Sequence, residues 1–215
     1  MQEYHKIDGI FAREDVRPHK IIWGQYRNPV IEALKDIEWV FTEKIDGTNI
    51  RVHWDGHRVT FGGRTDAAQI PESLLHVLTD LFDGAKNEQV FEQNFGETPV
   101  TLYGEGYGPK IQKDGGLYSD VQKFILFDVK IGKYWLEREQ IEKIAKSLDV
   151  EVVPIVFTGS LYPAIAFAQQ GFNSVIAQTE RPAEGIIGTP KCNVLERDGK
   201  RVIVKLKTHD LQEVR

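Results

Sequence analysis

The stretch from residue 39 to residue 61 constrains the fold most, because it predicts two strands joined by a tight turn. Residues 39–44 read as an apolar strand, and residues 48–54 alternate apolar and polar side chains. Asp55-Gly56 is a strong hairpin-turn signal, and residues 58–61 read as the returning strand. Strands joined by so short a turn run antiparallel. The chain is therefore expected to contain an antiparallel sheet.

Further strands and helices follow this hairpin in irregular order. Residues 71–82 carry apolar side chains at helical spacing, with Glu72 in the first turn. The other predicted helices cover residues 30–34, 137–147, 160–169 and 173–178. The other predicted strands cover part of residues 1–12 and residues 20–23, 99–104, 122–131, 151–157 and 201–207, the last after a turn at 197–200. This order predicts an α+β fold with antiparallel sheets rather than a doubly wound parallel sheet.

Length and composition describe an ordinary globular chain. With 215 residues, 41% hydrophobic and 27% charged, we expect one domain over residues 39–215 and an N-terminal segment, residues 1–38, packed on it. The apolar runs are too short to cross a bilayer, and the start lacks a signal-peptide pattern. The single cysteine, Cys192, excludes an internal disulfide and suits the reducing cytoplasm. A net charge of −5 is not that of a protein that coats nucleic acid, so any hold on nucleic acid is expected to be local.

A lysine in the sequence EKIDGTN, residues 43–49, is the first candidate for catalysis. The tetrapeptide KIDG occurs twice, but only Lys44 follows an apolar strand and precedes the hairpin, whereas Lys6 reads as a strand end before an Asp-Gly turn. A lysine amine can attack the α-phosphate of a nucleoside triphosphate and form a phosphoramidate. It must first lose its proton, which requires desolvation or neighbouring positive charge.

Two further lysines can supply that charge. Lys205 and Lys207 alternate along the predicted last strand and so share one face. Together they are expected to lower the pKa of Lys44 and to hold the α-phosphate.

Two glutamates complete the candidate catalytic set. Glu105 lies in YGEGYG, where glycines allow the backbone to approach a ligand closely. Glu184 lies in AEGII and is the candidate for holding Mg²⁺, which needs few carboxylates because water and phosphate oxygens fill its other positions. The six histidines show no metal-binding cluster and no acid–base pattern.

In this order the motifs resemble those of the covalent nucleotidyltransferases, the polynucleotide ligases and RNA capping enzymes. Asn49, where DNA ligases and capping enzymes usually carry arginine, makes the chain look most like the ATP-dependent RNA ligase 2 family. The resemblance covers residues 39–208. It implies a nucleotidyltransferase domain in which Lys44 takes AMP from ATP with Mg²⁺ or Mn²⁺. AMP would then pass to a 5′-phosphate end, and a 3′-hydroxyl would displace it.

The resemblance also assigns roles in nucleotide binding. It implies that Glu43 reads adenine, that Phe127 stacks on the purine, that Arg64 contacts ribose or end phosphates, and that Glu105 contacts ribose. Phe127 could instead be a core residue of its strand. Arg51 shares a face with Asn49, where it either lines the pocket or lies at the surface. The cofactor-binding set is Glu43, Ile45, Asp46, Asn49, Arg64 and Phe127.

Two departures from the family pattern stand out. Gly188 occupies a place where many relatives carry lysine or arginine, which puts one phosphate contact in doubt. The chain ends eight residues after Lys207, so no C-terminal accessory domain is expected. The expected partners are RNA ends in nicked duplex or broken RNA, with DNA-containing duplexes and a repair protein as alternatives. The alternative functions are a capping guanylyltransferase, a DNA ligase and a nucleotide-dependent RNA-end binder without turnover.

Overall fold

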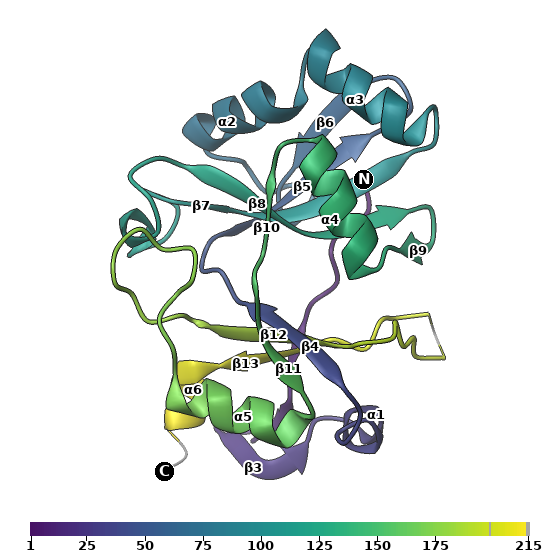
Figure 1. The fold of residues 1–215 in the computed structure, drawn as a ribbon. Coiled ribbons are helices and arrows are strands. Elements are labelled where there is room, and N and C mark those ends of the chain that lie inside the picture. Colours follow the sequence, from purple (N-terminus) through teal and green to yellow (C-terminus); the bar gives the residue numbers. More distant parts are fainter. Residues whose placement is uncertain (198, 214–215) are drawn as a thin grey trace. The chain divides into compact units, whose positions relative to one another are not determined.

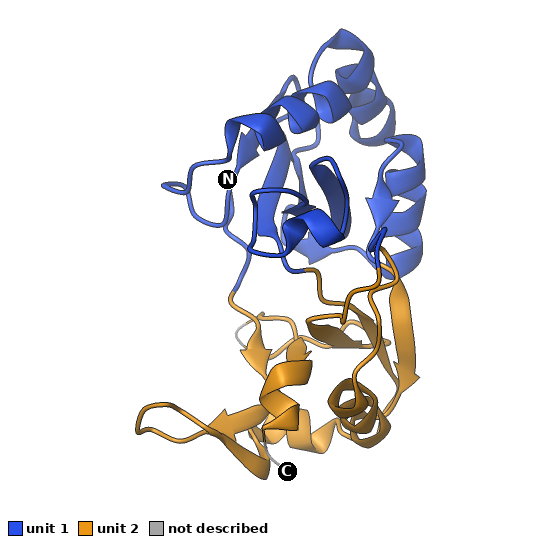
Figure 2. Ribbon diagram, turned by 90° about the vertical axis from the view of Figure 1, so that its left-hand side faces the viewer, with its two compact units in different colours: residues 1–5, 46–153, 177–179 blue, residues 6–45, 154–176, 180–215 orange. Residues whose placement is uncertain are grey.

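The computed structural model describes residues 1–197 and 199–213 and divides the chain into two compact units (Figure 2). Unit 1 contains Met1–His5, Asp46–Val153 and Ala177–Thr179, and unit 2 contains Lys6–Ile45, Pro154–Ile176 and the chain from Glu180 onward. Residues 1–38 therefore do not form a unit of their own. The chain passes from unit 2 to unit 1 directly after Lys44-Ile45, so the candidate motif lies at the boundary in sequence.

Unit 1 is built on a six-stranded sheet whose central strands are antiparallel (Figure 1). The predicted hairpin is present, because β5 pairs with β6 from Trp54↔Val59 to Arg51↔Gly62. The strands lie in the order β10-β8-β7-β5-β6, with β9 paired to β8. They are β5 (Thr48–Trp54), β6 (Val59–Gly62), β7 (Val100–Tyr107), β8 (Lys123–Ile131), β9 (Tyr134–Trp135) and β10 (Glu151–Val152).

Helices cover one face of this sheet with their apolar sides. α2 (Glu72–Phe82) buries Leu74, Leu78 and Phe82, at the spacing that the sequence predicted. α3 (Ala85–Phe95) and α4 (Arg138–Ser147) pack into the same core, which includes Ile50, Val52 and Trp54 of β5. A short 3₁₀ helix covers Gly115–Leu117. Because side chains alternate along a strand, Asn49, Arg51 and His53 point to the opposite face.

Unit 2 has a five-stranded sheet in the order β1-β13-β12-β4-β11 (Figure 1). Its strands are β1 (Asp8–Gly9), β4 (Trp39–Glu43), β11 (Ile155–Gly159), β12 (Gly185–Pro190) and β13 (Val204–Lys207), and a separate hairpin joins β2 (Phe11–Arg13) to β3 (Ile21–Tyr26). Its helices are α1 (Pro29–Ala33), α5 (Leu161–Gln170) and α6 (Thr208–Gln212).

Alternation along β13 gives the unit 2 sheet an apolar face and a cationic face. Val204 and Leu206 are 0% and 1% exposed in a core shared with α5, while Lys205 and Lys207 are partly exposed. The same-face arrangement predicted for the two lysines is therefore present.

The α+β class with mainly antiparallel sheets is confirmed, but two local predictions were wrong and the helix α3 was missed. Residues 151–157 are not one strand, since β10 and β11 belong to different sheets and Pro154, which has no N–H to donate, lies between them. Residues 173–178 are not helical, because their polar groups bond to distant residues. The helix α3 was missed, because only Phe91 of its 11 residues is fully buried and its sequence is mostly polar. Asp198 of the predicted turn lies outside the described residues.

Candidate functional site

Unit 2 brings Lys44, Glu184 and Lys207 together in one charged cluster. Lys44 directly follows β4, and its backbone N–H donates to the Gly185 carbonyl at 2.9 Å. Its Nζ donates to Oε2 of Glu184, while Nζ of Lys207 lies 2.7 Å from Oε1 of the same carboxylate. Pairing of β12 with β13 sets this geometry, because Gly185 lies opposite Lys207. Glu184 therefore contacts both Lys44 and Lys207, which brings three of the five predicted catalytic residues together.

The Glu184 carboxylate is held ionised by its two partners. Burial opposes its ionisation, but Lys44 and Lys207 outweigh burial, so the pKa of Glu184 lies below its ordinary value. The carboxylate is therefore an anion at neutral pH. Before the Lys44 amine can attack a phosphorus atom, it must leave its ion pair with Glu184.

Lys205 lies beside the cluster on the same face of β13. Burial is the main cause that lowers the pKa of Lys205, and the neighbouring charges of Lys207, Lys44 and Lys6 lower it further. Crowding of ammonium groups around the candidate nucleophile was predicted from the sequence. In the structure, Lys6 of the first KIDG copy adds to this crowding.

Lys205→Met is expected to raise thermal stability while impairing chemistry. A lysine pKa that is lower in the folded state means that protonated Lys205 opposes folding at every pH below its folded pKa. Lys205 is only partly buried, so solvent screens these charges and the gain is small, roughly 2 °C in Tm at pH 7. Thermal unfolding at pH 7 measures it, with Lys191→Met on the surface as the control. An unchanged or lower Tm would show that charge crowding at Lys205 does not oppose folding.

Glu43 is buried and holds the loop that contains Ser174 and Val175. It is 1% exposed, and its carboxylate accepts hydrogen bonds from the Ser174 hydroxyl and, at 2.8 Å, from the Val175 N–H. Burial raises the pKa of Glu43, and these bonds counteract part of that effect. Contact of Glu43 with adenine stays a prediction. The bonds to the loop explain why residues 173–178 are not a helix.

Gly188 has no room for the lysine that many relatives carry. It lies opposite Phe41 on the buried face of β12, where a Cβ atom would approach the Phe41 ring at 2.3 Å. We expect Gly188→Lys to destabilise the protein by about 1–3 kcal/mol, since overpacking displaces a fully buried ring. Urea unfolding measures the loss. If Gly188→Lys is as stable as the parent and reacts faster with ATP, then a lysine at residue 188 fits and contacts a phosphate.

Asn49 and Glu105 lie side by side on the open face of unit 1. They are register partners on β5 and β7. Oδ1 of Asn49 is buried and accepts no hydrogen bond within the described part of the chain. Buried polar atoms in native proteins nearly always have a partner, so this acceptor indicates a place for a ligand donor.

The turn after Lys44 explains why the two KIDG copies differ. A Cβ atom at Gly47 would lie 2.3 Å from the Gly106 carbonyl, so only glycine fits. At Gly9 the nearest atom would be 4.0 Å away. Two residues that the sequence did not indicate hold the turn: the Tyr118 hydroxyl accepts from the Asp46 N–H at 3.0 Å, and Gln112 donates to the Gly47 carbonyl at 2.8 Å.

Arg51 holds the loop that carries Arg64. Arg51 is fully buried and donates to the Gly63 carbonyl at 2.6 Å and to the Met1 carbonyl at 3.0 Å, and it pairs with Asp66 at 2.9 Å. Arg64 itself is exposed. The sequence suggested that Arg51 lines the pocket or lies at the surface, and neither role includes holding this loop. The only indication in the sequence was that Arg51 shares a strand face with Asn49.

The remaining candidates are placed as follows. Phe127 is half-buried on β8 and makes an edge contact with the Tyr4 ring, 5.1 Å between centroids. Ile45 is 5% exposed. Phe127 is therefore not a simple core residue, and the N-terminal Tyr4 was missed because nothing in the pattern of residues 1–12 pointed to this face.

The protein offers few ligands for a metal ion, so a bound ion would be held mainly by water and phosphate oxygens. Within the described residues, no three or more His, Cys, Asp or Glu side chains gather into a metal site. Glu184 supplies one ionised carboxylate, which fits magnesium because that ion retains waters and takes phosphate oxygens.

Residues 37–207 match the RNA ligase family. The chain belongs to this family. No curated protein is significantly similar in sequence. Among solved structures, the Naegleria gruberi RNA ligase with PPi is 23% identical with a TM-score of 0.64, covering 87% of this chain and 54% of that one. A variant of that ligase with ATP and Mn is 22% identical, with a TM-score of 0.64 and the same coverage.

A second variant with ATP and Mn is 21% identical with a TM-score of 0.65, covering 97% of this chain and 62% of that one. At these identities the likeness establishes an RNA ligase fold. This chain spans about half the length of the first of these ligases. No described helix has the length and apolar character needed to cross a membrane.

Proposed function

We propose that this chain is an ATP-dependent RNA ligase that works through a covalent lysyl-AMP at Lys44. The observation that carries the proposal is the Lys44–Glu184–Lys207 cluster in a chain of the RNA ligase family. A lysine at a strand end, beside a carboxylate and further lysines, has the groups needed to attack a phosphate and to stabilise the charge that develops on it.

The first step transfers AMP to the protein. Lys44 leaves Glu184, loses a proton to solvent, and its lone pair attacks the α-phosphorus of ATP. An N–P bond forms, the bond from the α-phosphorus to the bridging oxygen breaks, and pyrophosphate leaves. Lys205 and Lys207 would neutralise the equatorial α-phosphate oxygens, which is the main work of catalysis in such displacements.

The next two steps join the ends. An oxygen of the RNA 5′-phosphate attacks the α-phosphorus, the N–P bond breaks, and Lys44 recovers its amine. The 3′-hydroxyl then attacks the 5′-phosphate and releases AMP, with its proton passing to solvent. The phosphodiester forms with no other product.

Further residues are proposed to hold the nucleoside of ATP. Asn49, with its unpartnered Oδ1, and Glu105 beside it are the proposed contacts to ribose, and Phe127 is the proposed stacking partner of adenine. Arg64 would contact end phosphates. Glu184 would hold a bound divalent ion, which would neutralise the triphosphate.

Covalent labelling tests this function. The protein is mixed with α-labelled ATP and Mg²⁺ or Mn²⁺, denatured and separated; label should remain on the protein and be released by pyrophosphate. Label from γ-labelled ATP should not be retained. Labelling by GTP instead would indicate a capping enzyme, joining of DNA ends alone would indicate a DNA ligase, and no label would leave a non-catalytic RNA-end binder.

A further inference from the structure

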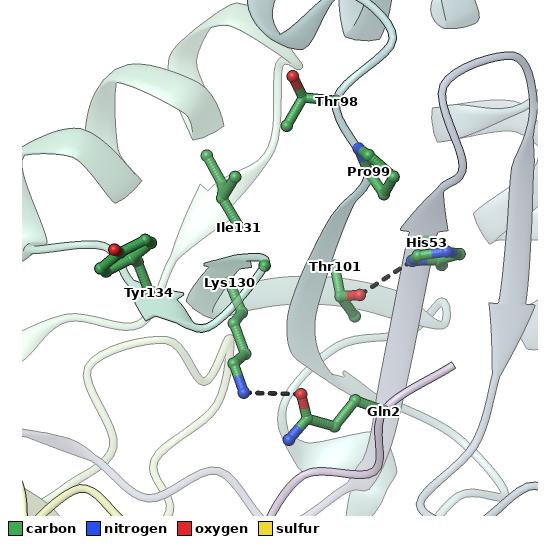
Figure 3. Close-up of a pocket in the computed structure, with 9 residues that line it drawn as sticks. Gln2, His53, Thr98, Pro99, Thr101, Lys130, Ile131 and Tyr134 are labelled. Carbon is green, nitrogen blue, oxygen red and sulfur yellow. Dashed lines mark hydrogen bonds between the residues drawn. The ribbon is translucent and has the colours of Figure 1, made fainter. Parts of the chain in front are cut away.

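Unit 1 contains a hollow of about 420 Å³ that the proposed ATP contacts do not use (Figure 3). Small-molecule sites typically have volumes of about 300–1,000 Å³, so a nucleobase fits. The walls come from the N-terminus, β5, the start of β7 and the β8–β9 turn. The lining residues are Gln2, His53, Thr98, Pro99, Thr101, Lys130, Ile131, Gly132 and Tyr134.

This hollow lies at the far end of the strands that carry the ATP contacts. His53 follows Asn49 by four residues on β5, which separates them by roughly 13 Å along the strand. Thr101 precedes Glu105 by four residues on β7, the neighbouring strand. A ligand in the hollow would therefore not overlap a nucleoside at Asn49.

The chemistry of the lining suits an anion with an aromatic part. The nine lining residues described here include no carboxylate. Lys130 donates to the Gln2 side chain at 2.6 Å (Figure 3). Its ammonium lies 5.0 Å from the Trp135 ring centroid. Lys133 adds a second cation, 5.5 Å from the centre of the Tyr134 ring.

Two other groups complete this set. Tyr134 is 65% exposed, which leaves its ring accessible to a planar ligand. On the opposite wall, His53 bonds to the Thr101 hydroxyl at 2.9 Å (Figure 3). Burial and the N-terminal amino group lower the pKa of His53, so the imidazole is neutral at pH 7 and offers a hydrogen-bonding ring to a base edge.

We propose that this hollow binds one nucleotide of the RNA strand, with its base stacked on Tyr134 and its phosphate beside Lys130. The proposal rests on the proposed function only for the choice of RNA as the ligand. Stacking on an aromatic ring and contact with a lysine are the two contributions that hold single-stranded RNA without regard to sequence. Such a site would hold the strand during the steps that follow adenylation.

The test measures binding of a short single-stranded RNA by fluorescence anisotropy across a salt series. Tyr134→Ala should weaken binding about tenfold, and Tyr134→Phe should restore it, because the ring and not the hydroxyl stacks. Lys130→Gln should lower the slope of log Kd against log salt by about 0.7, the loss of one phosphate contact. Tyr162→Ala, an 80% exposed tyrosine on α5, and Lys143→Gln on α4 are the matched controls and should bind like the parent.

Self-adenylation separates this proposal from the proposed function. All of these variants should take label from ATP like the parent, since none touches the ATP contacts. Tyr134-dependent RNA binding in a protein that takes no label would overturn the ligase function and leave this site standing. RNA binding that is unchanged in Tyr134→Ala and Lys130→Gln, or absent in the parent, would overturn the site.

Discussion

Lys44→Ala is expected to retain no covalent AMP, a loss of more than about 10³-fold, because it lacks the amine that is proposed to form the N–P bond. Alanine also removes one partner of Glu184, so a change in folding could imitate a loss of chemistry. Lys44→Arg avoids this difficulty, since arginine keeps the positive charge and the bond to the carboxylate but cannot be deprotonated. Both variants should bind no label after incubation with α-labelled ATP and denaturation.

Lys6→Ala is the matched control, because Lys6 stands in the other KIDG copy of the same chain. It should take label at a rate near that of the parent. Lys6 is close enough to Lys205 to lower the pKa of Lys205. A modest change in the labelling rate of Lys6→Ala is therefore compatible with a charge effect, whereas a complete loss of label is not. Covalent label that survives in Lys44→Arg and disappears in Lys6→Ala would show that Lys6, and not Lys44, is the nucleophile.

The sequence predicted those parts of the fold whose signals are local. The turn at Asp55-Gly56 and the apolar spacing of α2 determine their structures within a few residues, and both are present. The segment of residues 173–178 failed because Ser174 and Val175 bond to Glu43, 131 and 132 residues away in sequence. The spacing of apolar residues in a sequence does not reveal contacts between residues so far apart in the chain.

The same distinction applies to the candidate site. Alternation on β13 was enough to place Lys205 and Lys207 on one face. It could not show that Glu184 bridges Lys44 and Lys207, because that depends on how β12 pairs with β13. Sequence context also distinguished the two KIDG copies, but it could not show the close approach of Gly47 to the Gly106 carbonyl, which is a contact across the sheet.

Glu184→Gln is expected to slow adenylation by at least about 10²-fold and to lower the stability of the protein. Glutamine has the size of glutamate but no charge, so Lys44 and Lys207 lose the anion that separates them. Breaking charge-assisted hydrogen bonds in a partly buried site costs about 2 kcal/mol, or roughly 5 °C in Tm. Glu38→Gln is the control: Glu38 pairs with Lys191 at 2.8 Å, but both side chains are about half exposed or more, so little change is expected.

The pH dependence of the stability difference identifies the cause. Because the folded-state pKa of Glu184 is below its ordinary value of 4.5, its contribution is fully present above pH 4.5 and is lost as the pH falls through the folded pKa. The Tm difference between the parent and Glu184→Gln should therefore be constant from neutral pH to about pH 5 and shrink at lower pH, where protonated Glu184 and glutamine carry the same charge. A difference that persists undiminished in strong acid would mean that shape or packing at residue 184, rather than the ion pairs to Lys44 and Lys207, stabilises this cluster.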